Sequence, residues 1–146
     1  MSGPHAVVDA SAIVALVMRE RGGDVIHTLL SARHVVTTPT GLAEAIISCQ
    51  RKGFRGTRDG LARDLGEFGL HVEPLVGSDA LEMAFLLERS DELGARHKSK
   101  SGKVGRLSLG DVACLAVARR LGVPAIVSDG TWEILDVPGL KVMPFR

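Results

Sequence analysis

The alternation of short apolar runs with longer amphipathic segments constrains the fold of this chain more than any other feature. Three apolar runs have the length of buried strands: AVVD (6–9), HVVTT (34–38) and PAIVSD (124–129). The first two are followed by SAIVALVMRER (11–21) and TGLAEAIISCQRKG (40–53), in which apolar residues recur at helical spacing. Apolar strands that alternate with amphipathic helices form a parallel sheet covered on both faces. The pattern therefore predicts an α/β fold with a central, mainly parallel sheet.

The remaining segments complete this expectation. Amphipathic patterns predict helices over 24–32, 57–69, 79–94 and 108–122. Residues 70–75, LHVEPL, predict a brief extended piece that is broken by proline, and residues 141–145, KVMPF, predict a last strand.

Length and composition favour one globular domain over residues 1–146. The chain has 146 residues and is 45% hydrophobic, which suffices for a real core. Cys49 and Cys114 lie in helical patterns without a CxxC motif, so we expect core thiols and no structural zinc. No apolar run has the length of a membrane span, and no basic segment precedes the first one. The expected compartment is the cytoplasm.

Charge is unevenly distributed along the chain. The net charge is only +1, yet residues 93–110 contain no acid. Within it, residues 94–106 are rich in glycine and serine, cannot bury an apolar face, and are expected to form a mobile loop. It is either a solvated linker or a segment that contacts nucleic-acid phosphates through its basic residues, which are Arg96, Lys98, Lys100, Lys103 and Arg106.

Four acids interrupt the apolar patterns at related places. Asp9 and Asp129 each end a predicted strand, whereas Glu44 and Asp111 lie early in predicted helices. Right-handed crossovers make such strands parallel, so their carboxyl ends meet at one edge of the sheet. Open α/β sheets bind ligands at that edge. We therefore expect four carboxylates from distant parts of the chain to converge there.

Each acid also has an ordinary structural explanation. Asp9 can cap its helix, and Asp111 fits a capping box led by Ser108. Glu44 can face solvent, and Asp129 with Gly130 forms a common turn pair. These explanations are acceptable singly, but together they require four acids to converge by accident.

Convergence of the acids would require a counter-charge. Two like charges about 4 Å apart repel by roughly 4 kcal/mol at an effective dielectric constant of 20. Hard divalent cations prefer oxygen ligands, so a site of carboxylates without histidine or cysteine suits Mg²⁺ or Mn²⁺ better than zinc. Such cations lower the pKa of bound water and support phosphodiester hydrolysis.

The chain resembles the PIN-domain ribonucleases, and within them the VapC toxins of bacterial toxin–antitoxin pairs. The resemblance rests on VVDASAIVAL (7–16), on Glu44, and above all on LSLGDVACLAVARRLGVPAIVSDGTW (107–132). It implies a three-layer α/β/α fold and an endoribonuclease that uses Mg²⁺ or Mn²⁺. It further implies an RNA substrate, a cognate VapB-like antitoxin and a homodimer, with no membrane partner.

The resemblance also implies roles for individual residues. Asp9 and Asp111 would be metal ligands, Glu44 a ligand or the group that holds the attacking water, and Asp129 an assisting acid. Ser11 and Ser128 would orient these carboxylates by hydrogen bonds.

The chain departs from the family pattern in two places. Residues 94–106 are longer and more basic than is usual, and Gly130 and Thr131 follow Asp129 where a basic residue is more common. Glu133 or Asp136 could therefore take the place of Asp129. The few aromatic residues offer little for base stacking, and Phe68 and Phe85 are expected in the core.

Two other functions remain open from the sequence. A phosphoacceptor signalling domain also places acids at strand ends, but it requires a paired acid after the first strand, whereas Asp9 is single. The second is a PIN fold that processes or binds RNA without toxicity. Unlike a toxin, such a protein would leave bacterial growth unaffected when expressed alone.

Overall fold

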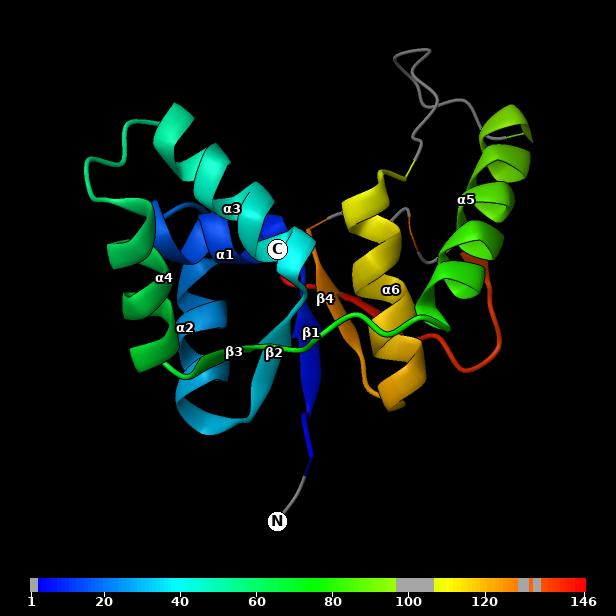
Figure 1. Cartoon of the computed structure of the whole chain (residues 1–146), viewed down its shortest axis with the longest axis horizontal. Coiled ribbons are helices and arrows are strands. Elements are labelled where there is room, and N and C mark those ends of the chain that lie inside the picture. The colour runs from blue at the N-terminus through cyan, green and yellow to red at the C-terminus, as the bar shows by residue number, and fades with distance from the viewer. Residues whose placement is uncertain (1–2, 97–106, 129–131, 133–134) are drawn as a thin grey trace.

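The computed structural model describes residues 3–96, 107–128, 132 and 135–146 (Figure 1). Its sheet has five strands in the order β3-β2-β1-β4-β5, and all four pairings are parallel. The strands are β1 (Ala6–Val8), β2 (Val35–Thr37), β3 (Leu70–Val72), β4 (Ala125–Val127) and β5 (Val142–Pro144). The predicted α/β class is confirmed, and the sheet is wholly parallel.

Helices cover both faces of this sheet (Figure 1). Within the described residues they are α1 (Ala10–Val17), α2 (Gly23–Ala32), α3 (Pro39–Arg51), α4 (Arg58–Glu67), α5 (Asp79–Arg96) and α6 (Leu109–Leu121). One core cluster packs α1 to α4 against one face, and a second packs α5 and α6 against the other. The fold thus has three layers, as the resemblance implies.

The two core clusters arise from the alternation of side chains along the strands. On β1, Ala6 and Val8 belong to the first cluster, whereas Val7 belongs to the second. Successive strand residues point to opposite faces, so a continuous apolar run is what a doubly covered strand requires. Cys49 and Cys114 are both buried free thiols, which confirms their prediction as core residues.

Polar side chains set the starts of the helices that follow strands. Asp9 caps α1 and Thr38 caps α3, where Pro39 occupies the first turn. Their side chains accept hydrogen bonds from Ala12 N and Gly41 N, respectively. The N–H groups in the first turn of a helix have no partner within the helix. Proline has no N–H, so it is well suited to this position. The capped starts fix where α1 and α3 leave the sheet edge.

The expectation that Phe68 and Phe85 are core residues is wrong. Phe68 is 53% exposed and Phe85 is 45% exposed. Phe68 meets the His27 ring edge-on with centroids 5.6 Å apart, and Phe85 lies below the Arg119 guanidinium. Both occupy the outer faces of their segments, where a helical pattern alone does not separate a buried from an exposed aromatic ring.

None of the helices in the described part of the chain combines the length and apolar character needed to cross a membrane.

Candidate active site

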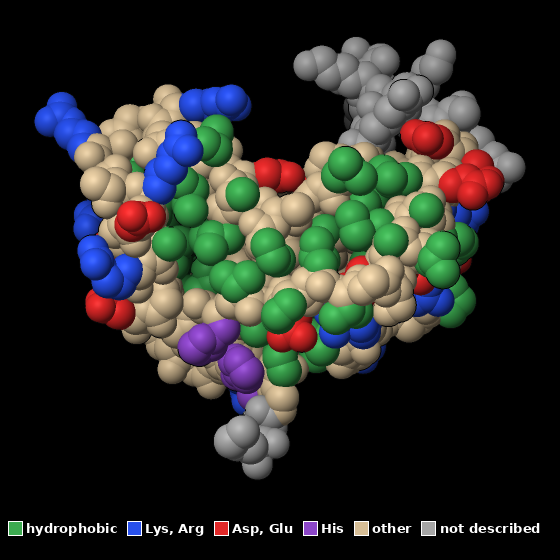
Figure 2. All heavy atoms as spheres, viewed as in Figure 1, with side chains coloured by type: hydrophobic (Ala, Val, Ile, Leu, Met, Phe, Trp, Pro, Cys, Tyr) green, Lys and Arg blue, Asp and Glu red, His purple; other side chains and the backbone are tan. Residues whose placement is uncertain are grey.

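Three of the four predicted acids lie at the carboxyl edge of the sheet. Asp9 directly follows β1, Glu44 lies on α3 after β2, and Asp111 lies in the first turn of α6 before β4. Electrostatics links them, because the charge of Asp111 raises the pKa of both Asp9 and Glu44. Figure 2 shows an acidic side chain at this edge, between the apolar surfaces of the two helical layers.

Asp9 is the most buried of the three carboxylates, with 6% of its surface exposed. Burial raises its pKa from 3.8 to about 6, and the hydrogen bonds from Ser11 and Ala12 partly offset this effect. Ser11 Oγ donates to Asp9 Oδ1 at 2.6 Å, and Ala12 N donates to the same oxygen at 3.0 Å. Oδ2 accepts no hydrogen bond from the described residues, so it is available to a further ligand.

Glu44 extends from α3 to the start of α6. A Cβ atom added at Gly110 would lie 1.8 Å from Glu44 Oε1, so the carboxylate rests directly against that glycine. Glu44 is exposed, and the pKa of its carboxyl is raised, first by partial burial and then by Asp111. Glu44 therefore contacts α6 and does not simply face bulk solvent.

Asp111 forms the predicted capping box with Ser108. Ser108 N donates to Asp111 Oδ2 at 2.8 Å, and Asp111 N donates to Ser108 Oγ at 3.1 Å. These reciprocal bonds satisfy two helix donors and hold the carboxylate at the first turn of α6. The structural explanation of Asp111 is therefore correct, and it is compatible with a position beside the other acids.

Two residues near the acids were not predicted as parts of the site. Cys114 lies one turn beyond Asp111, and burial, followed by the charges of Asp9 and Asp111, raises its thiol pKa well above the usual value. The charge of Arg146 lowers the pKa of Asp9, and its Nη1 lies 3.9 Å from Glu20 Oε1. Cys114 lies in the stretch 107–132 that carries the resemblance but was predicted only as a core thiol, and Arg146 belongs to no motif.

The other predicted site residues divide into two groups. Ser11 contacts Asp9 as predicted, and Ser128 follows β4 in a partly buried position at the same edge. Asp129, its possible substitute Glu133, residues Lys98, Lys100, Lys103 and Arg106, and the side chain of Arg96 lie outside the described residues. Asp136, the other substitute, is exposed and has a positive φ of 46°.

The described carboxylates fit a hard divalent cation in their donor chemistry. Asp9, Glu44 and Asp111 present only oxygen donors. Burial raises the pKa of Asp9 and of Glu44, the charge of Asp111 raises both further, and a cation would oppose both effects. Within the described residues, no three histidine, cysteine, aspartate or glutamate side chains are already grouped as a metal site. The donor set therefore suits Mg²⁺ or Mn²⁺, while the described part of the chain lacks a preformed cage.

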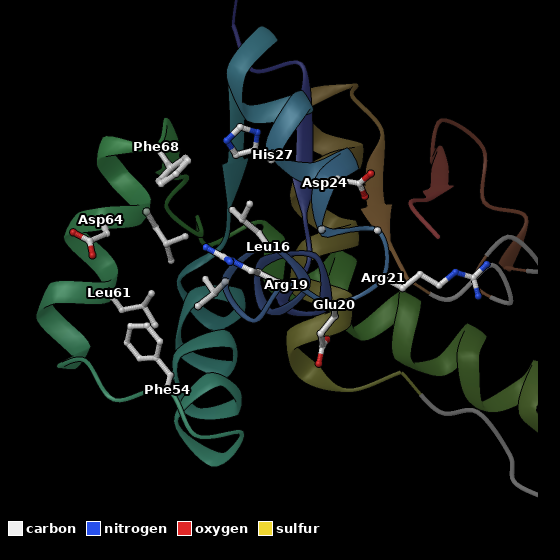
Figure 3. A pocket seen from close by; sticks show the side chains of 14 residues that line it. Leu16, Arg19, Glu20, Arg21, Asp24, His27, Phe54, Leu61, Asp64 and Phe68 are labelled. Atoms are coloured by element: carbon white, nitrogen blue, oxygen red, sulfur yellow. The ribbon is translucent and has the colours of Figure 1, made fainter.

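A separate pocket of about 840 Å³ lies between α1, α2 and α4 (Figure 3). Apolar side chains such as Leu16, Phe54, Leu61 and Phe68 line it, and Arg19 points into it. None of the acids predicted as site residues lines this pocket, whose own acids are Glu20, Asp24 and Asp64. Its apolar lining suits the binding of an apolar segment.

Comparison with known proteins identifies a family. The family model described as PIN domain matches residues 6–137 of this chain. No curated protein sequence matches the chain.

Solved structures of similar fold include a toxin, a toxin–antitoxin complex and a DNA-bound protein. VapC20 of Mycobacterium tuberculosis, a toxin described as cleaving the sarcin-ricin loop, is 18% identical, with a TM-score of 0.59 over 93% of this chain and 98% of that one. A toxin–antitoxin complex from Klebsiella pneumoniae gives 17% identity and a TM-score of 0.55, covering 92% and 94%. FitAB bound to a DNA fragment gives 12% identity and a TM-score of 0.63, covering 96% and 94%.

Proposed function

The chain belongs to the PIN-domain family, and from this premise we propose that it is a Mg²⁺- or Mn²⁺-dependent endoribonuclease that acts as the toxin of a type II toxin–antitoxin system. The observation that carries the proposal is the position of Asp9, Glu44 and Asp111, from three separate segments, at the same carboxyl edge of the sheet. The charge of Asp111 affects the pKa of both other acids, which supports one shared site.

Each acid has a role that follows from its setting. Asp9 Oδ2 and the Asp111 carboxylate would hold the cation, and Glu44, the most exposed of the three, would hold a ligand water or the attacking water. Ser11 fixes the orientation of Asp9 through its hydrogen bond to Oδ1. When bound, the divalent ion supplies an activated water and stabilises the leaving oxygen of a phosphodiester.

The proposal includes residues outside the described part of the chain. Asp129 would assist the three acids directly or through water, with Ser128 orienting it. Arg96, Lys98, Lys100, Lys103 and Arg106 would contact RNA phosphates, because an acidic site needs nearby cations to attract a polyanion.

Cleavage of RNA by the purified protein tests the nuclease. We expect cleavage with Mg²⁺ or Mn²⁺ that leaves 5′-phosphate ends, because a metal-activated water attacks the phosphorus. EDTA and the substitutions Asp9→Asn or Asp111→Asn should each abolish it. Cleavage by nuclease-free preparations that survives EDTA and Asp9→Asn would reject this proposal.

Expression of the chain alone in a bacterium tests the toxin role. We expect growth arrest with the wild type and normal growth with Asp111→Asn at equal soluble yield. Normal growth with soluble, cleavage-competent wild type would instead support a PIN-domain protein of RNA processing. Labelling by a small phosphodonor would support a phosphoacceptor domain.

The antitoxin is the partner that the toxin role requires. Similar structures include a toxin–antitoxin complex, which supports a partner of this kind. The pocket between α1, α2 and α4 would accept apolar side chains of an antitoxin segment. The charged pocket residues Arg19, Glu20 and Asp24 would orient this segment. Phe68→Asp changes a pocket residue that is 53% exposed. It should weaken rescue of growth by the antitoxin while RNA cleavage persists, and rescue unchanged by this variant would remove the pocket from the proposal. A homodimer, implied by the resemblance, belongs to the same proposal.

A further inference from the structure

The Glu44 carboxylate fills the space beside a glycine, where a side chain would otherwise stand. A Cβ atom at Gly110 would lie 1.8 Å from Glu44 Oε1, 2.6 Å from Cδ and 3.1 Å from Oε2. Real Cβ atoms do not come this close to other heavy atoms, so the carboxylate of Glu44 occupies the space that any other residue at 110 would fill. Gly110 itself is buried.

Backbone geometry does not explain this glycine. Among the residues that the structure describes, the glycines with positive φ are 22, 53, 69, 122 and 139, and Gly110 is not one of them. Inside α6 it is unfavourable, because glycine in a helix costs about 0.5 to 1 kcal/mol relative to alanine. Gly66 in α4 offers a comparison, since a Cβ atom there would meet nothing within 4 Å. Gly110 is therefore explained by the space that its missing side chain leaves for Glu44, and not by its backbone conformation.

We propose that Gly110 is a positioning residue for Glu44. Its missing side chain lets the carboxylate from α3 lie against the first turn of α6, next to Asp111 and within the electrostatic field shared with Asp9. The inference rests on the proposed metal-dependent nuclease for its functional consequence, because Glu44 matters there through its place beside the other two acids.

The fold should tolerate a side chain at this position. The atoms that a Cβ would meet belong to the far end of a flexible glutamate, which is exposed and can rotate away. Alanine also favours the helix more than glycine. Gly110→Ala should therefore keep the protein folded while it moves the Glu44 carboxylate off α6.

The first test compares Gly110→Ala with Gly66→Ala, a matched helical glycine with open space. We expect both variants to be at least as stable as wild type in urea. Gly110→Ala should weaken Mn²⁺ binding in calorimetry and slow RNA cleavage by roughly tenfold or more, the size typical of lost ligand-orienting contacts. Gly66→Ala should change neither. Wild-type Mn²⁺ affinity and cleavage in Gly110→Ala would overturn the proposal.

A double-mutant cycle distinguishes positioning of Glu44 from general damage to α6. Once Glu44→Ala removes the carboxylate, adding Gly110→Ala should cause no further loss of Mn²⁺ affinity or cleavage. A further loss as large as that in the wild-type background would show that Gly110 acts on something other than Glu44, and would contradict the proposal.

Crystal structures of the metal-free proteins keep this proposal separate from the nuclease itself. The Glu44 carboxylate should lie against residue 110 in wild type and be displaced in Gly110→Ala, whatever the enzyme does. If the displacement is seen but wild type neither binds Mn²⁺ nor cleaves RNA, the proposed function fails and the positioning contact remains. If the carboxylate lies in the same place in both structures, the positioning proposal fails.

Discussion

At the scale of single residues, the main feature of the site is a carboxylate, that of Asp9, in a position where burial disfavours its charged form. Asp9 caps α1 and is almost inaccessible, so its ionised form is unfavourable until a cation approaches. The placement of Asp9, Glu44 and Asp111 at the sheet edge could be predicted from the sequence, because these acids interrupt apolar patterns at a strand end and at helix starts. Gly110 and Arg146 could not, since the contact of Gly110 with Glu44 and the influence of Arg146 on Asp9 depend on how distant segments pack.

The raised pKa of Asp9 predicts how stability depends on pH. In the folded state the carboxyl of Asp9 stays protonated up to about pH 6, whereas in the unfolded chain it loses its proton near pH 3.8. The contribution of Asp9 to stability is therefore present below about pH 4 and is lost as pH rises through about 6. Asn does not titrate and still caps a helix. The free energy of unfolding of Asp9→Asn at pH 8 should therefore exceed that of wild type by about 1 to 3 kcal/mol.

Urea unfolding in EDTA between pH 4 and pH 8 measures this difference. The advantage of Asp9→Asn over wild type should shrink as pH falls toward 4. Asp64→Asn, which removes an exposed acid from α4, serves as the control for a simple loss of charge. A difference between Asp9→Asn and wild type that stays constant over the whole range would refute the burial argument.

At the scale of elements, the start of α6 combines a structural and a functional role. The motif S-x-x-D predicted its capping box, and the structure confirms both hydrogen bonds. Its apolar residues are buried nearly all round, which explains why α6 could be predicted so clearly from sequence. The pattern did not reveal that α3 would bring Glu44 against this same turn, because helix periodicity carries no information on the neighbouring helix.

Removal of the cap tests this double role. Ser108→Ala should destabilise the protein by about 1 kcal/mol, because the N–H of Asp111 loses its acceptor. It should also lower cleavage, since the capping box that holds the Asp111 carboxylate at the start of α6 loses one of its two hydrogen bonds. Thr57→Ala removes the equivalent cap of α4, where Thr57 Oγ1 accepts from Gly60 N at 3.0 Å, and should cost similar stability without affecting cleavage. Equal loss of cleavage in the two variants, measured at equal folded fractions, would argue against a separate role for Asp111.

At the scale of the whole molecule, the strand order puts β1 and β4 side by side, which brings the segments after them to one edge. The parallel sheet and its edge could be predicted from the alternation of strands and helices. The pocket between α1, α2 and α4 could not, because it arises from how three helices fail to close over one another. Likewise, the exposure of Phe68 and Phe85 depends on which helix faces remain uncovered, and a pattern of apolar residues does not specify this.

One ion-pair group joins α6 to the connection between β3 and α5. Arg120 Nε donates to the buried carboxylate of Asp79 at 3.0 Å, and Nη2 donates to Pro74 O at 3.2 Å. Because removal of a partner leaves a buried charge unpaired, Arg120→Met should lower the free energy of unfolding by about 1 to 3 kcal/mol. Lys52→Met breaks an exposed pair with Glu20 and should cost less than about 1 kcal/mol. If urea unfolding shows the same loss of stability in Arg120→Met and Lys52→Met, burial of Asp79 does not strengthen its ion pair.

Calorimetric titration of Mn²⁺ into the metal-free protein at pH 8 tests the central claim most directly. The claim is that acids from three segments share one cation. Wild type should take up Mn²⁺ saturably, and Asp9→Asn and Asp111→Asn should each remove most of that binding although they lie on different elements. Absence of uptake by folded wild type, or uptake that both variants retain, would contradict it.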